Sequence, residues 1–337
     1  MDQMKRYQLL ENWVKNKFPT RSFSLLPISV DASFRRYFRI KFSDKFAPKT
    51  IILMDAPPQY EDCVSFLNVA DIFSAANVHV PEILGRDLRQ GFLLLSDFGD
   101  TTYMEALRGE PSASDDLYHD AIDTLIRIQL ASCAGKLPNY DETLLFNELS
   151  LFPKWYLTKH LNIELDANQK NNLSACFTEI LKNNLIQPKV YVHRDFHSRN
   201  LMVTSPNPGI IDFQDAVYGP ITYDLVSLFK DAYVYWDEER ILDWVIRYWE
   251  KARKIGLPVA EDFSDFYRDF EWMGVQRHIK ILGIFARLYH RDGKNSYLRN
   301  IPVVVSYLRK TCDRYRELNF LFELFDELDS KKQKTRN

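Results

Sequence analysis

The amino-acid sequence of 337 residues predicts an α+β fold in two units, a small β-sheet with a helix followed by a larger, mainly helical part. Two patterns predict this division. Alternating apolar and charged residues, typical of half-buried strands, gather in residues 29–98, and apolar residues recur at three- and four-residue spacing from about residue 114 onward. The length agrees with two domains, since roughly 150 residues per domain is common.

The first unit is predicted from three extended segments and one helix. Apolar and charged side chains alternate in a strand at residues 38–42, and a more apolar strand spans residues 50–55. A helix beginning near Glu61 presents one apolar face, formed by Cys63, Phe66, Leu67, Ala70 and Phe73. A further extended run covers residues 91–98. We therefore assign the domains as a first unit at residues 1–96, a connector at 94–99, a second unit at 100–330 and a polar tail at 331–337.

The composition excludes several classes of function. The chain carries 46 acidic and 44 basic residues, a net charge of −2, whereas nucleic-acid-binding domains are usually strongly basic. No apolar run approaches the ~18 residues of a membrane span. The first residues lack the apolar centre of a signal peptide, and the four cysteines lack the spacing of a zinc or redox motif. We expect a cytoplasmic protein with reduced thiols, and no nucleic acid, membrane or obligate protein partner.

Residues 189–213 carry the polar side chains best suited to chemistry. A strand at Val190 to Val192 leads into His193, Arg194 and Asp195. Two short apolar strands follow, at residues 201–203 and 210–211, and the turn residues Pro206, Pro208 and Gly209 join them. The pattern predicts a β-hairpin directly after a polar loop.

The hairpin predicts a metal site. If its register is symmetric about Pro206, Asn200 lies opposite Asp212, and directly opposed side chains have Cβ atoms about 4.5 to 5.5 Å apart. An amide oxygen and a carboxylate at that spacing can share Mg²⁺, which takes oxygen ligands. Asp195, five residues before Asn200, would lie beside the metal and accept a proton from a hydroxyl group.

The same residues resemble a known family. The pattern HxDxxxxN, followed by an apolar strand that ends in Asp, is similar to the signature of the aminoglycoside phosphotransferase and choline kinase group, distant relatives of protein kinases. The resemblance implies a two-lobed protein-kinase-like fold that binds ATP and Mg²⁺. It implies that Asp195 is the catalytic base, that Asn200 and Asp212 are metal ligands, and that His193 is a structural residue of the loop.

The tripeptide Asp97-Phe98-Gly99 precedes this motif, whereas the metal-binding Asp of this architecture follows it. We therefore assign the tripeptide to the connector between the lobes. Backbone groups of Leu95, Ser96 and Asp97 are expected to bind adenine there.

Longer segments resemble a narrower family. SVDASFRRYFRI, IILMDAPPQYEDC, GFLLLSDFGD, GIIDFQDAVYGPITYDLVSLFKDAYVYW and EWMGVQRHIKILGIFARLYHRDGK are similar to the anomeric sugar kinases that phosphorylate N-acetylmuramic acid and N-acetylglucosamine at C1. The similarity extends over about residues 5 to 325. It implies a small-molecule amino-sugar substrate and the salvage of peptidoglycan sugars towards UDP-linked precursors in a bacterial cytoplasm.

One feature departs from the wider kinase pattern. The strand at residues 50–55 should supply a lysine to the nucleotide phosphates, and it has none. The nearest cations are Arg35, Arg36, Arg39 and Lys49, of which we assign Arg36 and Arg39 to ATP. The loop at residues 29–33 has no glycine, so backbone N–H groups and hydroxyls are expected to contact phosphate, at Ser29, Asp31, Ala32 and Ser33.

The acceptor site is expected around the base and on the helical unit. Its candidate residues are His197, Arg199, Asp215, Tyr218 and Arg277. Muramic acid carries a lactyl carboxylate, which suits the planar fork of an arginine, either Arg199 or Arg277. Asp224 is expected to cap the next helix and brace the loop.

Two other functions stay open from the sequence. One is a phosphotransferase for another small hydroxyl compound, such as an aminoglycoside, although a cationic antibiotic should need a site rich in carboxylates. The other is a pseudokinase that binds without catalysis, which the missing lysine favours and the joint presence of Asp195, Asn200 and Asp212 opposes.

Overall fold

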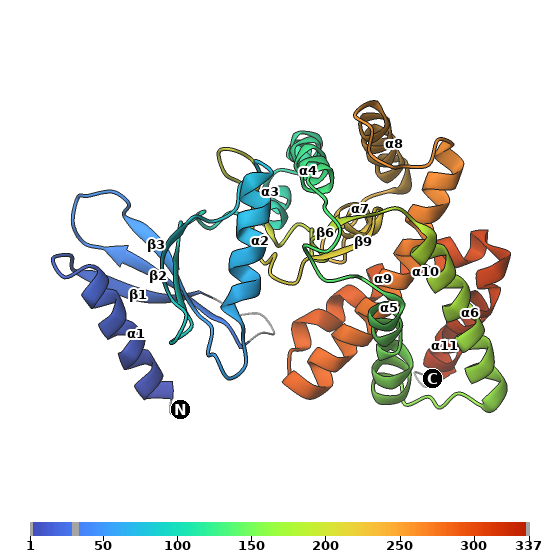
Figure 1. Cartoon of the computed structure of the whole chain (residues 1–337). Helices are drawn as coiled ribbons and strands as arrows, with labels where there is room; N and C mark the ends of the chain where they lie inside the picture. Colours follow the sequence, from blue (N-terminus) through green and yellow to red (C-terminus); the bar gives the residue numbers. More distant parts are fainter. Residues whose placement is uncertain (1–2, 29–33, 335–337) are drawn as a thin grey trace. The chain divides into compact units, whose positions relative to one another are not determined.

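The computed structural model describes residues 3–28 and 34–334, which divide into two compact units (Figure 1). The first comprises residues up to Thr101 together with Met202–Asp215, and the second comprises Thr102–Leu201 and the chain from Ala216 onward. The predicted domain boundaries differ from this division, because they assigned residues 100–101 and 202–215 to the second unit.

Backbone and ring contacts explain why this hairpin belongs to the first unit. The Ile210 N–H donates to the His79 carbonyl (2.8 Å), and the Val203 N–H donates to the Thr101 carbonyl (2.9 Å). The ring of Phe213 packs against Phe66 at 4.8 Å between centroids. These contacts join residues far apart in sequence, so local periodicity does not reveal them.

The first unit contains an antiparallel sheet of five strands in the order β1-β2-β3-β5-β4. The strands are β1 (Phe23–Ile28), β2 (Arg36–Phe42), β3 (Thr50–Asp55), β4 (Ile83–Asp87) and β5 (Phe92–Leu95). The two inner strands predicted at residues 38–42 and 50–55 are confirmed. β1 and β4 were missed because they lie at the two edges, where Pro27 and Gly85 are tolerated and the alternation of buried residues is weak.

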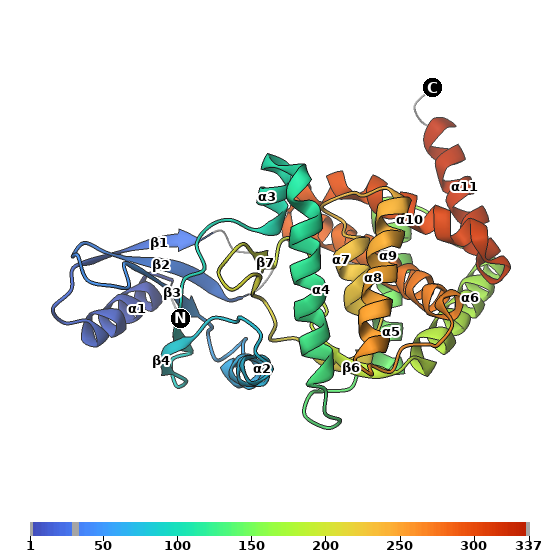
Figure 2. The ribbon, with the colours of Figure 1, turned by 90° about the horizontal axis from the view of Figure 1, so that it is seen from above.

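Two helices complete this unit. Helix α1 (Gln3–Lys17) lies along one face of the sheet in both views (Figures 1 and 2), with Leu10, Trp13 and Val14 in the core formed by β2, β3 and β5. Helix α2 (Cys63–Ala75) begins two residues later than predicted. Its N-cap is Asp62, whose carboxylate accepts from the Val64 N–H at 2.8 Å.

The second unit is mainly helical, as predicted. Its longer helices are α4 (Ser114–Leu130), α6 (Ala167–Ile186), α8 (Glu238–Lys254), α9 (Phe263–Asp292), α10 (Ile301–Arg314) and α11 (Asn319–Lys334). Shorter ones are α3 (Tyr103–Gly109), α5 (Glu142–Leu149), α7 (Tyr223–Phe229) and the π-helical η2 (Phe152–His160), with 3₁₀ segments at η1 (Pro111–Ala113), η3 (Asn295–Asn300) and η4 (Arg316–Leu318). Helix α11 continues to Lys334, so part of the predicted polar tail at residues 331–337 is helical. Residues 335–337 lie outside the described residues.

Helix α9 determines how the second unit is packed. The whole stretch from Phe270 to Gly283 is buried, although it includes charged side chains. Buried charges require partners, because an unpaired charge away from water is costly. Those partners lie on α5, α7, α10 and the loop that follows β6 (Lys189–Val192).

The segment predicted to be rich in strands is confirmed with shorter strands. β6 pairs antiparallel with β9 (Val217–Pro220), which the sequence did not indicate. β7 (Leu201–Met202) pairs with β8 (Gly209–Ile210), which confirms the hairpin. Of the four free cysteines, Cys133 alone is exposed. Within residues 3–28 and 34–334, no helix combines the length and apolarity that crossing a membrane requires.

Candidate active site

The loop that follows β6 holds the predicted base in a braced backbone. We call residues 193–200 the Asp195 loop. The Asp224 carboxylate, in the first turn of α7, accepts from the N–H groups of His193 (2.6 Å) and Arg194 (3.0 Å). Bracing by Asp224 is therefore confirmed. The capping prediction is wrong, because the N-cap of α7 is Thr222 and its side chain makes no capping hydrogen bond.

One further contact holds the loop beside Asp195, and the neighbouring backbone is strained. The His193 ring is buried, and its Nδ1 accepts from the Asp195 N–H at 3.2 Å. Arg194 has a φ of 76°, in the left-handed region that side chains with a Cβ rarely adopt. Such strain persists only where the surroundings impose it, and it gathers at functional sites.

The Asp195 carboxylate lies near cationic side chains and near His197, whose pKa is lowered by burial. Its Oδ1 lies 3.6 Å from Nη2 of Arg277 and 4.0 Å from Nε2 of His197. Burial alone would raise the pKa of Asp195, but Arg277, His197, Lys280 and Arg194 outweigh it and hold the pKa well below its ordinary range. The side chain is 46% exposed, so solvent screens part of this attraction. Asp195 is thus an ionised acceptor, suited to orienting a hydroxyl group.

A buried network anchors these cations. Glu148 on α5 accepts from Lys280 Nζ (2.8 Å) and Arg194 Nη2 (2.6 Å), and also contacts the Tyr140 hydroxyl. The Tyr223 hydroxyl accepts from Lys280 (2.8 Å). The sequence analysis missed these residues, although polar side chains at Gln276 and Lys280, four residues apart on an otherwise apolar helix face, were a usable signal.

Arg277, one of the predicted acceptor residues, lies beside the base and is buried. Its side chain is only 5% exposed, and Nη1 donates to the Arg194 carbonyl at 2.7 Å and to the Tyr223 hydroxyl at 3.1 Å. The guanidinium group therefore contacts the backbone of the Asp195 loop, in addition to the Asp195 carboxylate. This arrangement supports a role in positioning the base.

Asn200 has the geometry that a metal ligand needs. Its Nδ2 donates to the Asp195 carbonyl at 3.0 Å, which leaves the amide oxygen as the group available for a cation. The preceding turn is held by Asp231, whose carboxylate accepts from the backbone N–H of Ser198 (3.1 Å) and from its hydroxyl group. An amide oxygen fits the ligand preference of Mg²⁺.

The other predicted ligand, Asp212, belongs to the first unit. It is an exposed residue with a left-handed backbone (φ 63°), and its Oδ1 accepts from Gln214 Nε2 at 2.9 Å. Its charge also acts on the partly buried Tyr37 hydroxyl. A solvent-accessible carboxylate on a strained backbone fits a cation ligand as well.

The predicted nucleotide residues have mixed outcomes. Ser29, Asp31, Ala32 and Ser33 lie outside the described residues. Leu95 is the buried end of β5. The Ser96 N–H donates to the Glu82 carbonyl (3.0 Å) and its hydroxyl accepts from the Glu82 N–H (2.9 Å), so the Ser96 N–H is used within the protein and does not offer itself to adenine.

The two assigned arginines are engaged by carboxylates. Arg36 donates to Asp55 Oδ2 from Nε (3.0 Å) and Nη2 (2.5 Å). Arg39 donates to Asp97 from Nε (2.6 Å) and Nη2 (3.0 Å), and it also contacts Asp100. These contacts do not support either arginine as the cation that replaces the missing lysine.

The predicted acceptor residues have different surroundings. His197 and Arg199 share one aromatic neighbour, Tyr233, at 5.3 Å from the His197 ring and 4.8 Å from the Arg199 guanidinium carbon. Arg199 Nη1 lies 3.4 Å from the Tyr297 hydroxyl. Tyr218 lies in β9 opposite Tyr191 of β6, a position that supports the strand pair. Asp215 is exposed at the end of the first unit.

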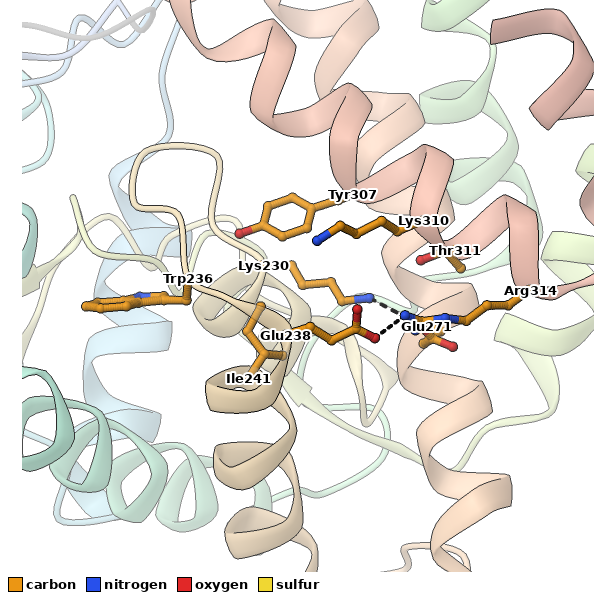
Figure 3. Close-up of a pocket in the computed structure, with 9 residues that line it drawn as sticks. All are labelled: Lys230, Trp236, Glu238, Ile241, Glu271, Tyr307, Lys310, Thr311 and Arg314. Carbon is orange, nitrogen blue, oxygen red and sulfur yellow. Dashed lines mark hydrogen bonds and ion pairs between the residues drawn. The ribbon is translucent and has the colours of Figure 1, made fainter. Parts of the chain in front are cut away.

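A separate cavity in the second unit contains none of the predicted site residues (Figure 3). Its volume is about 20 Å³, room for one water rather than for a sugar. Figure 3 shows Lys230 and Arg314 directed at Glu271. This cluster joins α7, α9 and α10, and we treat it below as part of the packing.

Comparison with known proteins identifies the class to which this fold and site belong. Residues 24–263 match the model of the phosphotransferase enzyme family, and the chain belongs to that family. It is 49% identical over 327 residues to N-acetylmuramate/N-acetylglucosamine kinase of Neisseria meningitidis serogroup B, with 96% of each chain covered. It is 45% identical over 333 residues to the protein of the same name from Pseudomonas aeruginosa, with 96% of this chain and 97% of that one covered.

Solved structures agree on the fold. A choline kinase from Streptococcus pneumoniae has a TM-score of 0.61 at 12% identity, covering 89% of this chain and 99% of its own. An ADP-bound aminoglycoside phosphotransferase has a TM-score of 0.57 at 12% identity, covering 92% and 99%. The predicted protein-kinase-like α+β fold and the family resemblance are confirmed.

Proposed function

We propose that the protein is an ATP-dependent kinase that phosphorylates the anomeric C1 hydroxyl of N-acetylmuramic acid, N-acetylglucosamine or both. The observation that carries the proposal is 49% identity, over 96% of both chains, to a kinase named for these two sugars. The product, a sugar 1-phosphate, serves the salvage of peptidoglycan sugars towards UDP-linked precursors. Because the reaction consumes ATP, we place it in the cytoplasm.

The Asp195 loop supports the chemistry. Asp195 would accept a hydrogen bond from the sugar hydroxyl, at roughly 2.6 to 3.2 Å between heavy atoms, and align its oxygen with the γ-phosphorus. The hydroxyl oxygen then forms the new O–P bond, and its proton passes to Asp195 as ADP leaves. Since phosphoryl transfer depends mostly on alignment and charge, a weakly basic carboxylate is sufficient.

Asn200 and Asp212 are the proposed ligands of Mg²⁺, through one amide and one carboxylate oxygen. When bound, the ion would neutralise charge on the nucleotide phosphates. Backbone groups at residues 29–33 and at Leu95 and Asp97 remain the proposed contacts of ATP. Among the acceptor candidates, Arg199 is proposed to bind a lactyl carboxylate, and two aromatic neighbours, Tyr233 and Tyr297, hold its guanidinium.

Turnover on three acceptors tests the proposal. Purified protein with Mg-ATP would be assayed on N-acetylmuramic acid, N-acetylglucosamine and kanamycin in parallel, with Asp195→Asn as the inactive control. Phosphorus NMR of the product should show a phosphate at C1. Turnover on kanamycin alone would establish an aminoglycoside phosphotransferase, and a folded protein that phosphorylates none of the three would contradict the proposal.

A further inference from the structure

The first unit contains the strand that lacks the usual lysine. Arginines of this unit form ion pairs with several different carboxylates. Asp55, at the end of β3, is fully buried and receives two of them. Arg6 on α1 donates to Asp55 Oδ1 (2.9 and 2.6 Å), and Arg36 donates to Oδ2. This cluster lies on the side of the sheet that α1 covers, and it fastens α1 to β2 and β3.

Arg35 belongs to another cluster. Its Nη2 lies 2.8 Å from Glu61 Oε2, and the two side chains are 9% and 14% exposed. Glu61 directly precedes Asp62, the N-cap of α2. A strand cation paired with a glutamate of the neighbouring helix is the arrangement by which protein kinases hold the lysine that contacts the nucleotide phosphates. Here the pair again joins a cation to a glutamate, but the cation is Arg35, the residue immediately before β2.

Tyr37 connects this pair to the proposed metal ligand. Arg35 and Tyr37 are two residues apart, so in an extended chain their side chains share one face. Burial and then the Asp212 charge raise the pKa of the Tyr37 hydroxyl, while Arg35 lowers it and Glu61 raises it. Asp212 and the Arg35–Glu61 pair belong to the same unit.

We propose that Arg35, oriented by Glu61, is the cation that binds the nucleotide phosphates in place of the missing lysine. The inference rests on the nucleotide-binding part of the proposed function and replaces the assignment to Arg36 and Arg39. A planar guanidinium can contact a phosphate with one edge and keep Glu61 on another, which an ammonium group does less well.

Nucleotide binding, measured by calorimetry without any acceptor, tests this inference. Arg35→Met should weaken Mg-ADP binding about tenfold or more, since a charge-assisted contact to phosphate is lost. Adenosine, which has no phosphate, should bind Arg35→Met and wild type equally. Glu61→Gln should weaken Mg-ADP binding less, because Arg35 keeps its charge and loses only its orientation.

Arg36→Met and Arg39→Met are the matched controls, since they remove the same charge from the same segment. Both should change Mg-ADP affinity less than about twofold, because their partners are carboxylates of the protein. If Arg35→Met proves poorly folded, the double variant Arg35→Met/Glu61→Gln removes the unpaired carboxylate and should show the same loss of Mg-ADP affinity.

Unchanged Mg-ADP affinity in a folded Arg35 variant would overturn the inference, as would a large loss confined to an Arg36 or Arg39 variant. Wild type that binds Mg-ADP but phosphorylates neither amino sugar would overturn the substrate assignment alone, with the Arg35 comparison still decisive. Wild type that does not bind Mg-ADP would overturn both.

Discussion

The side chain of Arg277 contacts both the backbone and the carboxylate of the Asp195 loop. It donates to the Arg194 carbonyl at 2.7 Å, where the backbone is in the left-handed region, and approaches the Asp195 carboxylate at 3.6 Å. The Tyr223 hydroxyl, itself fixed by Lys280, accepts from the same Nη1 of Arg277 at 3.1 Å. Because the side chain is buried, its removal should disturb the position of Asp195 rather than contacts with a dissolved sugar.

Arg277→Met should therefore lower kcat about 100-fold, with the KM values for ATP and sugar changed little, since a displacement near 1 Å costs about that much. Arg277→Lys should recover part of the loss because a cation remains near Asp195. Steady-state kinetics on the acceptor that wild type uses would check this, with the half-exposed Arg268 of the same helix, changed to Met, as the control. A selective rise in the KM for N-acetylmuramic acid would show instead that Arg277 binds the lactyl carboxylate.

His278, the next residue, makes stability depend on pH. Its ring is buried, stacks on Tyr307 at 5.1 Å between centroids, and contacts the Lys230 carbonyl through Nε2 at 3.0 Å. Burial, with smaller contributions from the charges of Lys230 and Arg277, lowers its pKa to about 3, from an ordinary value of 6.5. The unfolded chain thus binds a proton between these two values while the folded chain does not.

His278 destabilises the fold as the pH falls below about 6.5, by about 2 kcal/mol at pH 5, because the unfolded state gains a proton there. His278→Gln should be less stable at pH 7 but lose less stability between pH 7 and pH 5 than wild type. Urea unfolding at both pH values measures the difference, and equal losses in the two proteins would contradict the assigned pKa.

At the scale of elements, helix α9 makes two sets of contacts that its sequence does not distinguish. One part of it contacts the Asp195 loop through Arg277, and Glu148 of α5 through Lys280. Another part carries Glu271, which is 1% exposed and lies 3.7 Å from Lys230 Nζ and 2.5 Å from Arg314 Nη1 (Figure 3). The Tyr315 hydroxyl donates to its other oxygen at 2.8 Å. Glu271 thereby joins α7 and α10 to α9.

Glu271→Ala should destabilise the protein by about 3 to 5 kcal/mol, because it leaves the buried Lys230 ammonium group without its carboxylate. Glu238→Ala is the matched control. Glu238 contacts the same Arg314 but its side chain is 40% exposed, so the cost should stay below about 1 kcal/mol. Equal costs in urea unfolding for the two variants would show that burial is not what makes Glu271 important.

At the scale of the whole molecule, thiol reactivity reports whether both units are folded. Cys63 lies buried in the first unit, and Cys176 and Cys312 lie buried in the second, whereas Cys133 is exposed. Burial raises the pKa of Cys176 to about 11 and that of Cys312 to about 12, so their reactive thiolates are scarce.

With an excess of Ellman's reagent at pH 8, one thiol should therefore react quickly, and the remaining three should react only on unfolding. Cys133→Ser should abolish the fast phase and leave the slow one unchanged. Two fast thiols in wild type would indicate that one of the buried cysteines is accessible in solution.

The sequence alone determined the family, the inner strands at residues 38–42 and 50–55, the helical character of the second unit and the proposed reactive residues Asp195, Asn200 and Asp212. Periodicity and motif spacing are properties of neighbouring residues, so they can be read without coordinates. Edge strands β1 and β4 escaped because none of their residues is fully buried, and their sequences show no regular alternation of apolar and polar side chains.

Only the tertiary structure decided which cation meets which carboxylate. Arg35 pairs with Glu61 and Arg36 with Asp55, although the two arginines are adjacent. Arg277 reaches a carbonyl 83 residues away. In an unfolded chain, a long charged side chain has many possible partners within reach. In the folded protein, the packing of the surrounding elements brings one partner close and excludes water from that pair. For that reason the motif was legible in the sequence, while the residues that hold it in place were not.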